Sequence, residues 1–177
     1  MRSLHSVLLV PANMEDPIQI FHKSFPDFLT DPQRCEDERF FINLSVHHQQ
    51  IMFLCLDLMT ERLKRNICGL DEFVSLDRVE DLPTHKKTHI GDALGYACQF
   101  WTRHLVEIPS SSRDVEEIYK AINKFFTTQL LYWIEVLCLM RNLDVGVHAI
   151  NDVHKWYTLV SCILNAHQNL CSYFFFS

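Results

Sequence analysis

Histidine and cysteine are the side chains with chemistry to offer in this sequence, and few are spaced for it. His85 and His89 lie four residues apart in "HKKTH", a spacing that on a helix places two imidazoles where they could share a metal ion. No glutamate lies between them and no third ligand is nearby, so a solvated helix start is the alternative and we expect no metal site. His47 and His48 are adjacent, so they cannot share a helical face and at least one should point to solvent.

Catalysis would need a nucleophile next to an oriented base. Cys98 and His104 are the nearest such pair, but six residues apart on one helix they face different ways. The chain has only 4 glycines, and none opens a Gly-Lys-Ser or Gly-Lys-Thr phosphate loop. The sequence therefore predicts a protein that is not an enzyme and has no bound cofactor, with Cys98 and His104 chemistry as the enzymatic alternative.

Composition narrows the classes of partner. The 16 basic residues are scattered and are outnumbered by 22 acidic ones, which argues against binding to DNA or RNA. The 7 cysteines include no C-x-x-C pair, which favours a reduced, cytoplasmic protein. The longest apolar run, residues 130–140, is interrupted by Glu135, so we expect no membrane span.

Helices should position most of these side chains. The turn-rich "PANMEDP" between "HSVLLV" and "IQIF" predicts two short strands joined by a loop. "DEFVSLDRVEDLPTHKKTH" breaks the helical period and predicts a surface connection. The predicted fold class is mainly all-α, a helical bundle or hairpin stack preceded by a short N-terminal β-hairpin. Helical periodicity covers about residues 46–67, 93–105, 114–125, 130–138 and 147–164.

Individual residues indicate where these elements begin and how they pack. Asp114 and Glu117 have the spacing of an N-cap and its reciprocal carboxylate. "IFHKSFPDFLTD" is too mixed in composition for an ordinary strand, and Pro26 interrupts it too much for an ordinary helix. Residues 165–177 form an atypical tail ending in three phenylalanines, either truncated or tucked onto the bundle. The tryptophans lie on or beside apolar faces, which favours core packing over a partner-binding anchor for Trp101, Trp133 and Trp156.

The order of segments resembles a known family. "IFHKSFPDFL" follows the hairpin, and "CLDLMTERLKRNICGL", "YACQFWTRHL" and "LLYWIEVLCLM" follow in turn. This arrangement, over about residues 4–164, is similar to the region after the nucleotide-binding core in fungal, mushroom-type NACHT proteins. These are signal-transducing STAND NTPases that often end in WD repeats. The matching positions are Phe21, His22, Ser24, Phe25, Asp27, Phe28, Leu29, Cys55, Leu56, Ile67, Cys68, Tyr96, Ala97, Cys98, Trp101, His104, Leu105, Trp133, Ile134 and Glu135.

The resemblance implies a domain organisation and a function. Residues 1–25 would be the C-terminal wing of a winged-helix domain, and residues 26–177 a helical arm domain. The P-loop core would precede this chain and the WD repeats would follow it, so the chain would be a fragment or a decayed gene product. It would then be a non-enzymatic regulatory and scaffold segment that relays nucleotide state to oligomerisation. Its partners would be an upstream nucleotide-binding core or related NACHT proteins, and it would oligomerise only in the full-length context.

The same resemblance implies a role for His22. In related receptors the matching histidine contacts the β-phosphate of ADP, so His22 would sense ADP phosphate in a full-length context. The alternative is a histidine buried at a hairpin–helix junction with a satisfied ring nitrogen. The alternative for the whole chain is a stand-alone α-helical protein-interaction module that modulates intact relatives.

Overall fold

The computed structural model describes residues 8–9, 13, 19–71, 75–110 and 114–174, with side chains described as far as residue 162. The described residues are mainly helical with one small antiparallel sheet, which confirms the predicted fold class. The chain divides into two compact units, Met1–His47 and His48–Ser177. The predicted boundary between residues 25 and 26 stays a prediction.

The N-terminal unit contains the predicted hairpin. Strand β1 (Leu8–Leu9) pairs antiparallel with β2 (Gln19–Ile20), so that Leu8 lies opposite Ile20. Helix α1 (Ser24–Leu29) then follows, contrary to our expectation that proline would exclude a helix here. Pro26 is tolerated because it is the third helical residue, where a backbone N–H has no partner inside the helix.

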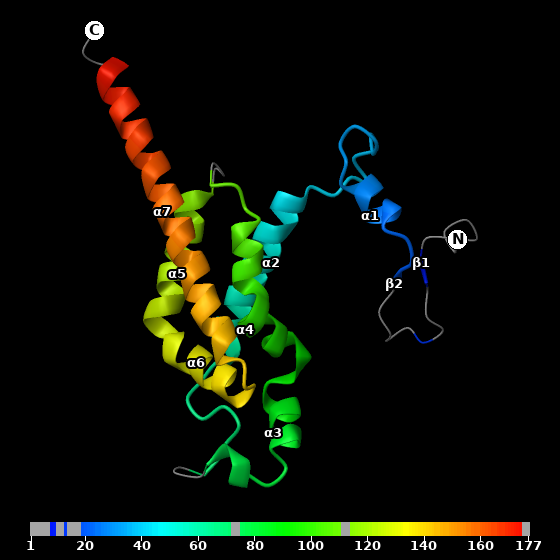
Figure 1. Ribbon diagram of the computed structural model, residues 1–177, viewed down its shortest axis with the longest axis vertical. Coiled ribbons are helices and arrows are strands. Elements are labelled where there is room, and N and C mark those ends of the chain that lie inside the picture. Colours follow the sequence, from blue (N-terminus) through cyan, green and yellow to red (C-terminus); the bar gives the residue numbers. More distant parts are fainter. Residues whose placement is uncertain (1–7, 10–12, 14–18, 72–74, 111–113, 175–177) are drawn as a thin grey trace. The chain divides into compact units, whose positions relative to one another are not determined.

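The helical unit is built around α4, which packs against α7, α6 and α3, while α6 also packs against α5 and α7 (Figure 1). Within the described residues, no helix has both the length and the apolar composition needed to cross a bilayer. Helix α2 (Leu44–Arg62) belongs to this unit from His48 onward. The other elements of the unit are the 3-10 turn η1 (Leu76–Arg78), α3 (Leu82–His89), α4 (Gly91–Val106), α5 (Val115–Thr128), α6 (Leu130–Leu139) and α7 (Leu143–Phe174).

Helix α2 ends at Arg62, so the predicted continuation to about Ile67 is wrong. The reason lies in α6: the Glu135 carboxylate accepts hydrogen bonds from the backbone N–H groups of Asn66 and Ile67, each at 3.1 Å. Those N–H groups therefore do not bond to carbonyls one turn earlier, as a continuing helix requires. Asn66 also takes a left-handed φ of 51°, which a helix interior does not allow.

The predicted surface connection before α4 is also partly wrong, because its second half is helix α3. Pro83 lies in the first turn of α3, where its missing N–H costs no hydrogen bond. Asp81 precedes the helix in a left-handed conformation, and its carboxylate accepts a hydrogen bond from the Thr84 hydroxyl at 2.8 Å. Proline thus starts this helix instead of preventing it.

Helix α5 begins after Asp114, as the sequence predicted, but the capping hydrogen bond is absent. The Asp114 carboxylate instead accepts a hydrogen bond from Gln49 Nε2 of α2 at 2.8 Å. The predicted pairing of Asp114 with Glu117 is therefore wrong in its side-chain contact. For the predicted atypical tail, the backbone of α7 is helical through Phe174, while its side chains and residues 175–177 lie outside the described residues.

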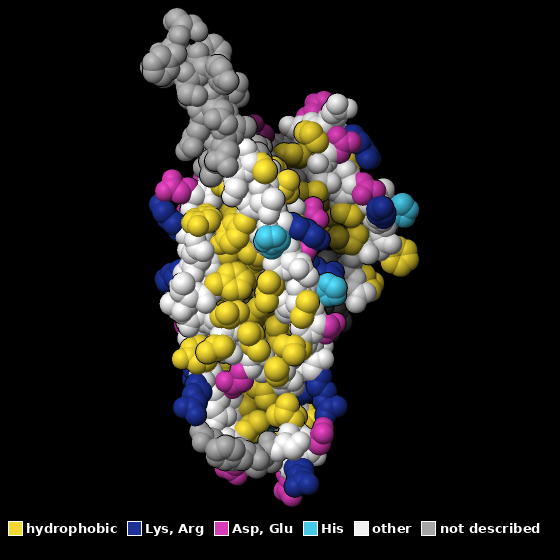
Figure 2. All heavy atoms as spheres, turned by 60° about the vertical axis from the view of Figure 1, so that its left-hand side comes forward, with side chains coloured by type: hydrophobic (Ala, Val, Ile, Leu, Met, Phe, Trp, Pro, Cys, Tyr) yellow, Lys and Arg dark blue, Asp and Glu magenta, His cyan; other side chains and the backbone are white. Residues whose placement is uncertain are grey.

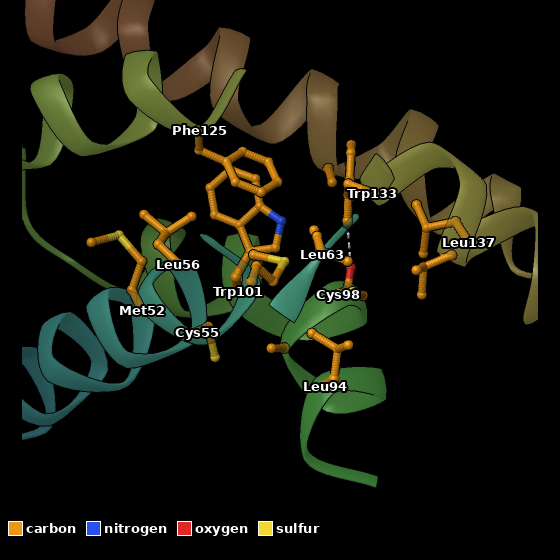
Figure 3. Close-up of a cluster of buried hydrophobic side chains, with 14 of the residues drawn as sticks. Met52, Cys55, Leu56, Leu63, Leu94, Cys98, Trp101, Phe125, Trp133 and Leu137 are labelled. Atoms are coloured by element: carbon orange, nitrogen blue, oxygen red, sulfur yellow. Dashed lines mark hydrogen bonds between the residues drawn. The ribbon is translucent and has the colours of Figure 1, made fainter. Parts of the chain in front are cut away.

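The core of this unit is aromatic. The rings of Trp101 and Phe125 lie 5.3 Å apart between centroids, and Trp133 lies edge-on to both (Figure 3). The indole N–H of Trp133 donates to the backbone oxygen of Cys98 at 2.9 Å, which fixes α6 on α4. All three tryptophans, Trp156 included, are buried, which confirms core packing for them.

Candidate functional site

His22 lies exposed at the start of α1. Its Nδ1 accepts a hydrogen bond from the backbone N–H of Ser24 at 3.2 Å and lies 2.8 Å from the Ser24 hydroxyl. Because a backbone N–H only donates, Nδ1 is the unprotonated nitrogen of the neutral ring and Nε2 carries the proton. Within the part of the chain that the structure describes, the Nε2–H of His22 makes no hydrogen bond. The alternative of a buried histidine is wrong, although its ring nitrogen is satisfied as that alternative required.

The neighbours of His22 that carry the family phrase differ in burial. Phe25 and Leu29 are half-buried, whereas Phe21 and Phe28 are exposed. The Phe28 ring lies 5.7 Å from the guanidinium carbon of Arg34, a distance suited to a cation–π contact. Phe21 and Phe28 therefore leave apolar surface exposed in the segment that contains His22.

His85 and His89 lie on one face of α3, as the spacing predicted, with ring centroids 6.2 Å apart. His85 Nδ1 lies 3.2 Å from the backbone oxygen of Cys68 and holds the loop after α2. Within the part of the chain that the structure describes, no three His, Cys, Asp or Glu side chains gather as a metal site would need. The contact between His85 and the backbone of Cys68 stabilises the loop after α2.

Cys98 and His104 are not arranged as nucleophile and base. Burial, followed by the nearby Cys55, raises the pKa of the Cys98 thiol to about 12, so the thiol stays protonated at neutral pH. The ring nitrogens of His104 contact other residues: Nδ1 lies 2.9 Å from His48 Nδ1, and Nε2 lies 2.8 Å from the Tyr96 hydroxyl. The described geometry gives this pair no shared site.

The His48–His104–Tyr96 cluster escaped the sequence analysis. His47 is exposed, as expected for one of two adjacent histidines, while His48 is half-buried against α4. Its partner His104 is 56 positions away in the chain, so spacing along the sequence carries no sign of the contact. The hint available was that His104 lies on the apolar face of its own helix.

Glu135 was also misread, as a mere interruption of an apolar run. It holds the loop after α2 through its two backbone hydrogen bonds, and Asn66 closes the same loop through side-chain bonds to the backbone of Leu70, each at 2.8 Å. A lone acidic residue on an apolar face indicates such a role, because buried charge requires donors.

The described fold and contacts define a helical protein in which His85, Glu135 and the His48–His104 pair link helices and loops to one another. Among curated proteins, the chain is similar to the vegetative incompatibility protein HET-E-1 of Podospora anserina, with 28% identity over 158 residues. The match covers 80% of this chain and 11% of HET-E-1, so the chain spans about a tenth of that protein's length. HET-E-1 is a fungal NACHT protein, and the resemblance to it is distant. No family model matches the sequence. None of the solved structures matches it significantly.

Proposed function

We propose that the chain is a non-enzymatic regulatory and scaffold segment of a NACHT-type STAND signalling NTPase. In this role a wing and a helical arm respond to the nucleotide that is bound to a separate core, and this response controls oligomerisation. The observation that carries the proposal is the match to HET-E-1, because it runs over 80% of the chain instead of one short motif. A cytoplasmic location belongs to the same proposal.

Residues in the segments that resemble the family pack several helices of the proposed arm into one body. Trp101, Leu105 and Trp133 are fully buried, and Glu135 fixes the loop after α2. Side chains that join several helices into one body transmit a displacement at one end to the other end, because packed cores resist gradual deformation. A relay needs this stiffness and needs no catalytic residue.

His22 supplies the proposed contact to nucleotide. Its outward Nε2–H is a donor that suits a phosphate oxygen, and an imidazole near an anion also gains a proton more easily. Ser24 orients the ring from the other side through its backbone N–H. We assign His22 to ADP phosphate only where a nucleotide-binding core is joined to these residues.

The proposal is tested by measuring binding of the 177-residue chain to the nucleotide-binding region of a related NACHT protein. That region is loaded with ADP in one arm and with a non-hydrolysable ATP analogue in the other. We expect tighter binding to the ADP-loaded form, because the resting state is the one in which the matching histidine contacts phosphate. Equal affinity in the two arms, or none in either, would contradict the proposal.

A second candidate function, a stand-alone interaction module, is favoured by an exposed apolar face. Figure 2 shows a band of hydrophobic side chains, edged by charged ones, along the side of the helical unit that carries α7. Contiguous exposed apolar surface marks protein contacts in soluble domains. The exposed residues of α6 and α7 include Leu131, Leu143, Val147 and Ile150, with Leu131 at 76% exposure.

The two candidates differ in what they need from nucleotide. A module that binds through this face would retain a partner whatever nucleotide is present, and Val147→Glu would abolish that binding. His148→Glu is the matched control, because His148 is the exposed neighbour of Val147 on the same helix. Nucleotide-dependent binding that survives Val147→Glu would exclude the module.

A further inference from the structure

Three titratable side chains, one on α2 and two on α4, form a chain of hydrogen bonds. His48 Nδ1 and His104 Nδ1 lie 2.9 Å apart, and His104 Nε2 lies 2.8 Å from the Tyr96 hydroxyl. His104 is 9% exposed and His48 is half-buried. The two imidazole rings are 5.1 Å apart between centroids and tilted by 39°, as a contact between ring edges requires.

The number of bound protons decides whether the hydrogen bonds among His48, His104 and Tyr96 persist. In the neutral pair one Nδ1 donates and the other accepts, and the Tyr96 hydroxyl takes the complementary role at His104 Nε2. One added proton leaves the contact intact, because an imidazolium still donates to a neutral imidazole. A second added proton puts N–H groups of two cations against each other, so the contact must break.

Burial and the facing histidine oppose protonation of His104. Burial lowers the pKa of His104 first, the facing His48 lowers it further, and Glu107 on the same helix opposes both by raising it. Two further charged groups lie near these contacts and interact with other residues. The guanidinium carbon of Arg103, next to His104 in the sequence, lies 5.4 Å from the centroid of the Phe100 ring, and Asp114 at the start of α5 accepts a hydrogen bond from Gln49.

We propose that the His48–His104 pair is a proton-operated clasp, which holds α2 on α4 at His48 until it takes up a second proton. His48 is the first residue of the helical unit, directly after the Met1–His47 unit. Opening the clasp frees the turns of α2 that join the two units in sequence. Acidification thus loosens this helix end, and the inference holds whether or not the chain serves a nucleotide-binding core.

The sign of the pH effect follows from proton linkage. Two unfolded histidines each take a proton near pH ~6.5, whereas the folded pair resists the second proton. The unfolded state therefore binds more protons below that pH. The contribution of the pair to the free energy of unfolding is complete above about pH 6.5 and is lost as the pH falls through the lowered pKa of His104.

The test is carried out on the full 177-residue chain by NMR and by amide hydrogen exchange. Ring signals of His48 and His104 should titrate together, with the second step below the ordinary histidine pKa. Protection factors of amides in the first turns of α2, corrected for intrinsic exchange, should fall at a pH below the second protonation step. The fall should be about tenfold for each pH unit by which that step lies below the ordinary histidine pKa.

His48→Gln should remove the pH dependence of these protection factors, because a glutamine amide bonds to His104 without a titrating charge. It should also return the pKa of His104 toward its ordinary value. His47→Gln is the matched control, since His47 is the exposed neighbour, and it should retain the full pH dependence. Independent titration of both histidines near pH ~6.5 in the unsubstituted chain, or an undiminished pH dependence in His48→Gln, would overturn the proposal.

Discussion

At the scale of single residues, the thiols of Cys55 and Cys98 show how burial controls reactivity. Burial raises the pKa of Cys55 to about 11 and that of Cys98 to about 12, and both side chains are buried in the helical core. We expect a thiol-reactive probe at neutral pH to label the exposed Cys138 and Cys162 well before either. Mass spectrometry of labelling kinetics checks this order. Rapid labelling of Cys98 in the folded protein would revive the enzymatic alternative.

His22 provides a prediction about a residue whose side chain is exposed. Joined to a nucleotide-binding core, His22→Ala should lose one charge-assisted hydrogen bond of about 1.5–3 kcal/mol and so weaken ADP retention about ten- to a hundredfold. The melting temperature should change little, because the His22 side chain is exposed. ADP release rates and thermal unfolding, with the exposed Lys23→Ala as control, measure both. An unchanged release rate with a lowered melting temperature would make His22 a purely structural residue.

At the scale of elements, two glycines test how closely the helices pack. A Cβ on Gly146 of α7 would lie 2.9 Å from Leu137 Cδ1 and 3.8 Å from the Trp133 ring. Leu137 and Trp133 are fully buried, so they have little room to move. We expect Gly146→Ala to be destabilising, since overpacking of about 1–3 kcal/mol outweighs the helix propensity gained by alanine, about 1 kcal/mol.

Gly95→Ala in α4 is the matched control for this effect. Its Cβ would meet the terminal methyl of Met140 at 3.2 Å, and the flexible end of a half-buried methionine moves at little cost. We therefore expect Gly95→Ala to be neutral or stabilising. Urea unfolding of both variants gives the comparison, and equal destabilisation by the two would contradict it.

The elements also show which parts of the fold local sequence determines. Periodicity predicted α4 to α7 because each of these helices buries one stripe of its own residues. The end of α2 could not be predicted, because Glu135, 69 positions after Asn66, takes the backbone N–H groups there. Pro26 and Pro83 were read as helix breakers, although proline in a first turn has no hydrogen bond to lose.

The same limit applies to the candidate sites. His22 was singled out because it belongs to a phrase that resembles a known family, and its hydrogen-bond partner Ser24 is only two positions away. The contact of His48 with His104 depends on how α2 packs on α4, which no spacing within either helix encodes. Short-range pairs are visible in a sequence, whereas pairs made by helix packing become visible only in the fold.

At the scale of the whole molecule, nucleotide binding is the property that separates the proposed segment from a complete NTPase. We expect the 177-residue chain to show no saturable binding of ATP or ADP, because its 4 glycines form no phosphate loop. Isothermal titration calorimetry with Mg²⁺ present measures this directly. Low-micromolar affinity for either nucleotide would refute it and would require a phosphate site built without a glycine-rich loop.

The stability of the helical unit depends on Trp101, whose ring joins three helices. It lies on α4 at 0% exposure and contacts Phe125 of α5 and Trp133 of α6. Trp101→Ala should cost about 3–5 kcal/mol, a large share of the roughly 5–15 kcal/mol that stabilises a domain. Urea unfolding followed by circular dichroism measures the loss.

Trp101→Phe is the matched variant for this prediction. The indole N–H of Trp101 has no hydrogen-bond partner among the described residues, so phenylalanine loses ring volume but no hydrogen bond. It should therefore cost clearly less than alanine, about 1–2 kcal/mol, because much of the aromatic packing remains. If Trp101→Ala kept the melting temperature of the unsubstituted chain, the side chain could not be the packing centre that its burial indicates. The helical unit would then be held together without the aromatic contacts among α4, α5 and α6.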